Sequence, residues 1–96
     1  MDMHFEWDDQ KAIGNLTKHG VSFAEASTVF ANPLAAIFDD EAHSVDEIRE
    51  VIIGHSAQGR LLVVVFTERA ENVVRIISAR QATIRERSDY EENIHI

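Results

Sequence analysis

Cysteine is absent from this sequence of 96 residues, and proline occurs only once. Without cysteine the chain can form neither a disulfide nor a thiolate metal site, which fits a reducing compartment. Apolar runs are short, and the longest, Leu61 to Phe66, falls far below the ~20 residues that span a bilayer. The N-terminal residues MDMHFEWDD lack the basic and apolar regions of a signal peptide. We therefore expect a cytoplasmic protein without a membrane partner.

Positive charge is also scarce. The sequence has nine Lys and Arg residues but 17 Asp and Glu residues, and its formal net charge is −8. An average surface of this sign repels nucleic acid. The charges are segregated, however: residues 39 to 50 carry six acidic side chains against one basic one, whereas Arg75, Arg80, Arg85 and Arg87 fall close together. A site that handles phosphate would therefore have to be local and built from a few arginines.

Local signals divide the chain into helices and strands within one domain, residues 1–96. Asp8 or Asp9 is a candidate N-cap for a helix that runs to His19, with Gly20 just beyond its end. On that helix the apolar side is predicted to hold Ala12, Ile13 and Leu16, and the opposite polar stripe to hold Lys11, Asn15 and Lys18.

Two capping boxes, Ser22 with Glu25 and Thr83 with Glu86, predict the starts of a second helix and of a C-terminal helix. Pro33 ends the second helix. Apolar and β-branched runs predict strands at 34–38, 48–55, 61–67 and 73–80, while residues 4–6 suit a short strand or an ordered arm. The expected fold is α+β, with two N-terminal helices, an antiparallel sheet of about four strands and a C-terminal helix.

Several short motifs, in order along nearly the whole chain, resemble the BrnT family, the ribonuclease toxins of type II toxin–antitoxin pairs. They are FEWD (5–8), KHGVSF (18–23), LLVVVFTER (61–69), RIISAR (75–80) and RER (85–87). The resemblance implies a RelE-like fold and an endoribonuclease that arrests translation. It also implies a BrnA-like antitoxin with a DNA-binding domain of the ribbon-helix-helix type, and a heterotetramer with an antitoxin dimer.

The chain departs from the family pattern at two positions. Ile48 stands where the family usually has a Glu before the arginine, and Ala70 stands where a Gly often follows Thr-Glu-Arg. The first departure would remove an ionisable group near the active surface, and the second would alter the turn between the last two strands. An alternative function therefore stays open: a catalytically weak module that binds its antitoxin and modulates repression of its own operon.

Metal-independent RNA cleavage, in which the 2′-hydroxyl attacks the adjacent phosphate, needs proton transfer and cations that stabilise the phosphorane. No metal or cofactor is expected. Arginine suits the phosphate-binding role because its planar fork matches two phosphate oxygens. The expected catalytic residues are Arg49, Arg75, Arg80 and His19. Strict alternation puts Arg75 with Ile77 and Ala79 but Arg80 with Ile76 and Ser78, so the two arginines are predicted on opposite faces.

The expected RNA-binding residues are Trp7, Lys11, Lys18 and Arg60. Purely structural alternatives exist for Trp7, Lys11 and Lys18, and also for His19. Trp7 suits a core anchor, Lys11 and Lys18 suit solvated surface, and His19 suits a helix C-terminus. The acidic segment 39–50 is predicted to contact a cationic segment of the antitoxin.

Overall fold

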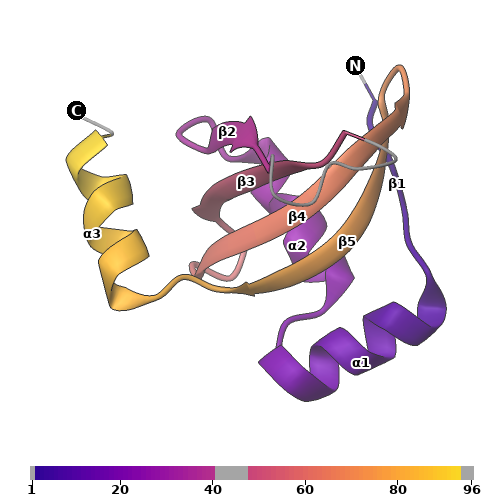
Figure 1. The fold of residues 1–96 in the computed structure, drawn as a ribbon, viewed down its shortest axis with the longest axis horizontal. Coiled ribbons are helices and arrows are strands. Elements are labelled where there is room, and N and C mark those ends of the chain that lie inside the picture. Colours follow the sequence, from indigo (N-terminus) through magenta and orange to yellow (C-terminus); the bar gives the residue numbers. More distant parts are fainter. Residues whose placement is uncertain (1, 41–47, 94–96) are drawn as a thin grey trace.

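The structure, a computed structural model, describes residues 2–40 and 48–93 of the chain. Their elements are β1 (His4–Glu6), α1 (Asp9–His19), α2 (Phe23–Thr28), the 3-10 turn η1 (Val29–Ala31), β2 (Ala36–Asp39), β3 (Glu50–His55), β4 (Leu61–Ala70), β5 (Val73–Gln81) and α3 (Ile84–Asn93). Figure 1 shows α2 behind the sheet, α1 beside it and α3 standing at the end of β5. Most of the acidic loop predicted from residue 39 to 46 lies outside the described residues.

Both N-terminal helices begin at the predicted caps. The Asp8 carboxylate accepts a hydrogen bond from the backbone N–H of Lys11, and Gly20 ends α1 with a φ of 69°. The Ser22 hydroxyl accepts from the backbone N–H of Glu25, which confirms the start of α2. The Glu25 side chain does not complete the capping box, because it contacts Arg60 and Ser56 instead.

The sheet has the strand order β1-β5-β4-β3-β2 (Figure 1). Four strands pair antiparallel, as predicted. The fifth, β1, pairs parallel with β5 through the partners His4 with Val73 and Glu6 with Arg75. The prediction of an antiparallel sheet of about four strands is therefore incomplete: residues 4–6 form a strand, and the sheet is mixed.

One face of this sheet carries the main core. Side chains from α2 and η1 pack on those of the strands, and Phe5, Trp7 and Ala12 pack around them; the fully buried strand residues include Leu62, Val64, Val74, Ile76 and Ala79. A smaller cluster lies on the opposite face, where Tyr90 of α3 packs against Ile53, Leu61 and Val63. We call this opposite face, which bears Val63 and Val65, the open face.

The prediction for the apolar side of α1 holds for Ala12, which packs against the core, but is wrong for Ile13 and Leu16. Ile13 and Leu16 are 62% and 52% exposed, whereas Asn15, placed in the polar stripe, is buried. The Asn15 side chain donates to the carbonyls of Val21 and Ala79 and accepts from the Ala79 N–H. Because β1 pairs only as far as residue 75, the edge of β5 at Ala79 has no strand beside it, and the Asn15 amide takes that place.

The turn before β5 does not depend on Ala70. Ala70 is the last residue of β4 and pairs with Val73, and the left-handed backbone conformation falls on Asn72, with a φ of 64°. Asparagine tolerates that conformation better than most residues. The Ala70 departure therefore leaves the turn intact.

Candidate active site

A β-bulge in β5 decides where its arginines lie. Val65 pairs with Ser78 but Phe66 pairs with Ile76, so Ile77 is an extra residue with no partner opposite it. An extra residue shifts the alternation of side chains beyond it by one position. Arg80 pairs with Val63 and Arg75 pairs with Thr67, which places both arginines on the open face. The prediction of opposite faces is therefore wrong, because alternation was assumed to be unbroken.

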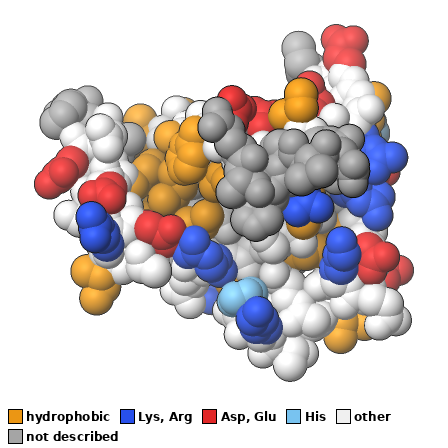
Figure 2. Space-filling model, viewed as in Figure 1, with side chains coloured by type: hydrophobic (Ala, Val, Ile, Leu, Met, Phe, Trp, Pro, Cys, Tyr) orange, Lys and Arg blue, Asp and Glu red, His pale blue; other side chains and the backbone are white. Residues whose placement is uncertain are grey.

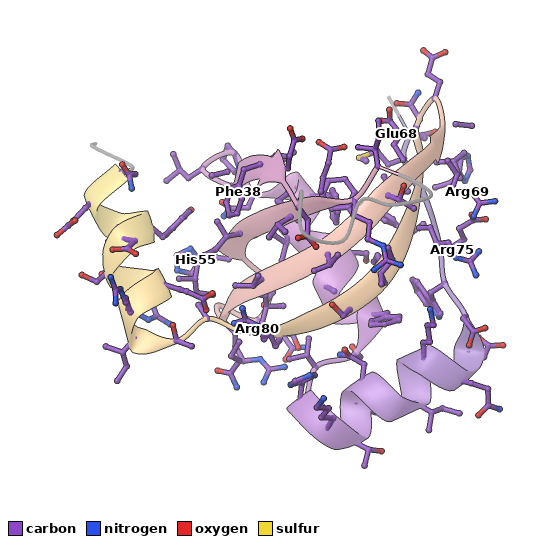
Figure 3. All side chains as sticks on the ribbon, in the orientation of Figure 1. Phe38, His55, Glu68, Arg69, Arg75 and Arg80 are labelled. Atoms are coloured by element: carbon purple, nitrogen blue, oxygen red, sulfur yellow. The ribbon has the colours of Figure 1, made fainter. Side chains whose placement is uncertain are left out.

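The two arginines occupy opposite ends of β5 (Figure 3). At about 3.3 Å per strand residue, they stand roughly 15 Å apart, too far to hold one phosphate. Arg75 forms an ion pair with Glu6 of β1, with 3.7 Å between Nη1 and Oε1.

Arg80 is held by α3. Its Nη1 and Nη2 donate to the two carboxylate oxygens of Glu86 at 2.7 and 2.9 Å, and Nη1 also faces the Gln81 carbonyl at 3.3 Å. The same carboxylate accepts from the Thr83 N–H while the Thr83 hydroxyl accepts from the Glu86 N–H, which confirms this capping box in both directions. The Glu86 carboxylate therefore takes part in the cap of α3 and also orients Arg80.

The hydrogen bond from Arg80 is the largest cause that lowers the pKa of Glu86, to about 2, with smaller contributions from Thr83. A carboxyl with this pKa stays ionised at neutral pH and is a poor proton acceptor. Glu86 therefore orients Arg80 rather than serving as the general base.

This pair has a measurable pH dependence. A Glu86→Gln variant is expected to lose about 1 kcal/mol of unfolding free energy at pH 7, a value reduced by the solvent exposure of the pair. Because the folded pKa lies below the ordinary 4.5, the stabilisation exists above pH 4.5 and declines as pH falls toward 2. Urea unfolding of both proteins between pH 7 and pH 3 would measure it. A difference that stays constant over this range would contradict the assignment.

A groove lies between the open face and α3. Its floor is formed by Val51, Ile53, Val63 and Val65, and its volume is about 640 Å³. Figure 2 shows apolar side chains gathered between α3 and the sheet, with charged side chains around them. Ser78 and Arg80 line the β5 side of this groove.

Of the remaining predicted catalytic residues, Arg49 shares the open face, because the backbone bond between Asp40 and Arg49 continues the alternation of Val51 and Ile53. Arg49, half-buried, directly precedes β3, and its carbonyl accepts from the Asp40 N–H. Ile48, the first departure, is 73% exposed, and its carbonyl accepts from the Thr67 hydroxyl. His19 ends α1, one helical turn beyond Asn15, and Asn15 binds the edge of β5 at Ala79, directly before Arg80.

The predicted RNA-binding residues lie outside the strands of the sheet. Trp7 packs edge-on against Phe23 with 5.9 Å between ring centroids, and Lys11 and Lys18 are exposed on α1. The Arg60 guanidinium donates to the buried Glu25 carboxylate and to the Gly20 carbonyl. These contacts support the structural alternative for Trp7 and a structural role for Arg60.

Sequence reasoning missed three groove residues, Glu86, Asp89 and Tyr90, which α3 brings against the sheet. The capping box identified Glu86 only as a helix cap. Within residues 2–40 and 48–93, no three His, Asp or Glu side chains converge as a metal site. Over the same part of the chain, no helix is long and apolar enough to cross a bilayer.

Comparison with known proteins identifies the family. The family described as "Ribonuclease toxin, BrnT, of type II toxin-antitoxin system" matches residues 7–86. The fold is similar to the crystal structure of the Brucella abortus ribonuclease toxin BrnT, with a TM-score of 0.67, 26% identity, and coverage of 84% of this chain and 97% of that one. No curated protein matches the sequence. The match over most of its length shows that the chain belongs to the BrnT family of ribonuclease toxins of type II toxin–antitoxin systems.

Proposed function

We propose that this protein is a metal-independent endoribonuclease that arrests translation by cleaving RNA in the cytoplasm. Its proposed partner is a BrnA-like, DNA-binding antitoxin of the ribbon-helix-helix type, whose dimer would hold two toxin copies in a heterotetramer. A RelE-like active surface on the sheet is part of this proposal. The observation that carries it is the bulge at Ile77, which puts Arg75 and Arg80 on the same open face.

Two arginines at this spacing suit an RNA strand rather than a single anion. Each guanidinium would contact its own phosphate, and the strand would run along β5. The scissile phosphate fits best at Arg80, beside Ser78 and at the edge of the groove. There the guanidinium would stabilise the additional negative charge that develops as the 2′-hydroxyl attacks.

Arg80 keeps donors for this role although Glu86 binds it. A guanidinium has five N–H groups. Glu86 occupies the end formed by Nη1 and Nη2, which leaves the side edge formed by Nε and the second Nη2 hydrogen. The Arg80 side chain is 41% exposed, so a phosphate can approach that edge. Glu86 would thus hold the fork in place without blocking it.

The test is cleavage of a labelled single-stranded RNA in the presence of EDTA. Arg80→Ala is expected to reduce kcat about 100-fold, the scale seen when one preorganised donor to a developing oxyanion is removed. Arg75→Ala is expected to raise KM more than it lowers kcat, because Arg75 would bind a phosphate next to the scissile one. The products should carry 5′-hydroxyls and cyclic or 3′-phosphates.

Arg85→Ala is the matched control, because Arg85 is exposed and does not line the groove. It should cleave like the wild type, and circular dichroism should show that all variants fold. Intact RNA with the wild type, even when ribosomes are added, would refute the nuclease proposal and favour the catalytically weak antitoxin-binding module. Growth arrest on expression of the toxin alone would separate these two functions in cells.

A further inference from the structure

The groove on the open face has mainly apolar walls and an apolar floor. Phe38 of the edge strand β2 forms one wall and is 53% exposed, while Tyr90 forms the wall on α3. With the four aliphatic side chains of the floor, they surround a volume of about 640 Å³, enough for several aliphatic side chains. Exposed apolar surface of this kind marks a site of interaction.

The charge around this groove has the wrong sign for nucleic acid. Among the described residues that line it, Asp40, Glu86 and Asp89 are acidic and Arg80 is basic. Arg80 and Glu86 neutralise each other through their ion pair, and the whole chain carries −8. A second row of phosphates beside the strand held by β5 would therefore be repelled, whereas a cationic peptide would be attracted.

We infer that this groove is the docking site for a segment of the antitoxin with apolar side chains at its centre and Lys or Arg on its flanks. The inference rests on the proposed function and specifies its regulation. The apolar side chains would cover Val51, Ile53, Val63 and Val65, and a flanking cation would face Asp89. The segment would thus neutralise the toxin by covering Arg80, and not by imitating RNA with a row of carboxylates.

The attachment of α3 fits such a partner. Besides the Arg80–Glu86 pair, α3 is attached to the rest of the protein through Tyr90. The Tyr90 hydroxyl donates to the Leu34 carbonyl at 2.7 Å, and its ring centroid lies 6.0 Å from that of His55. Tyr90 therefore fixes one wall of the groove, while Phe38 on the opposite wall stays open to solvent. An amphipathic segment can enter between these two walls.

The first test of the apolar contact is Phe38→Asp. Calorimetric titration with purified antitoxin from the same operon should show a loss of affinity of at least tenfold, because a carboxylate would be buried against the apolar segment. Ile13→Asp is the matched control: Ile13 is 62% exposed on α1 and does not line the groove. Its affinity should stay within about twofold of the wild type.

The second test separates the acidic rim from net charge. Asp89→Lys and Glu92→Lys change the total charge equally on the same helix, but only Asp89 lines the groove. Asp89→Lys should weaken antitoxin binding several-fold more than Glu92→Lys, and should flatten the dependence of affinity on NaCl concentration.

Each other result has a definite meaning. The docking site is overturned if Phe38→Asp weakens antitoxin binding no more than Ile13→Asp does, and Asp89→Lys no more than Glu92→Lys does. The nuclease proposal would be unaffected by that result. Loss of RNA cleavage by Phe38→Asp with unchanged antitoxin affinity would assign the groove to RNA and also overturn it. If the wild type binds no antitoxin, the proposed partnership fails and the docking site fails with it, whereas the RNA assay still reports on catalysis. Asp89→Lys keeps the inference testable if Phe38→Asp does not fold.

Discussion

An Arg60→Leu variant is expected to be strongly destabilised at pH 7, because it leaves the buried Glu25 carboxylate without its cationic partner. The side chain of Glu25 is 3% exposed, and Arg60 contacts both of its carboxylate oxygens. Arg60 is the largest cause that lowers the pKa of Glu25. Without Arg60 the carboxylate would stay buried beside Ser56 alone, so it would have to lose its charge or remain uncompensated.

Urea unfolding at pH 7 measures this effect, and a second variant identifies its cause. Arg60→Leu combined with Glu25→Leu should recover much of the lost stability, because neither charge is then buried. A double variant no more stable than Arg60→Leu would show that packing, and not the unpaired carboxylate, causes the loss. If Arg60 contacts RNA as predicted from the sequence, cleavage by the folded single variant should fall as well.

Structural features that depend on neighbouring residues could be predicted from the sequence. The side chains of Asp8, Ser22 and Thr83 each accept a hydrogen bond from the backbone N–H three residues later. Both partners of each bond are therefore close together in the sequence. The four antiparallel strands follow from apolar runs, because β4 is buried along most of its length. These signals are short-range, and the resemblance to the family added the expectation of an antitoxin and an RNA substrate.

Features that depend on distant partners could not be predicted in the same way. No residue in RIISAR signals the extra residue at Ile77, because a bulge is a mismatch between two strands and not a property of one. The same limit applies to β1, whose three residues become a strand only beside β5. The orientation of Arg80 depends on a bond to Glu86 that forms only where α3 turns back at Thr83.

The helical-wheel prediction for α1 was wrong for a related reason, because the burial of Asn15 also depends on a distant partner. It ranks positions by side-chain polarity, so Leu16 was predicted to be buried and Asn15 exposed. The edge of β5 reverses that order, because the backbone N–H and C=O of Ala79 need partners that a leucine cannot provide. A buried amide can therefore outweigh an apolar side chain when it completes a sheet edge.

Asn15→Leu is consequently expected to lose about 3 kcal/mol of unfolding free energy, although it makes the helix more apolar. Three hydrogen bonds disappear, and buried backbone groups of Val21 and Ala79 lose their partners, at about 1 to 3 kcal/mol each without full additivity.

Leu16→Ala, which shortens a residue predicted on the apolar side of the helix, should cost less than about 1 kcal/mol, because Leu16 is 52% exposed. Urea unfolding of the two variants decides between the two orientations of α1: a core position at Leu16 would instead cost about 2 to 5 kcal/mol and leave Asn15→Leu nearly neutral. The same experiment bears on function, because β5 carries Arg80 directly after the residue that Asn15 holds. If Asn15 fixes that end of the strand, Asn15→Leu should also lower RNA cleavage by the protein that remains folded, whereas Leu16→Ala should not.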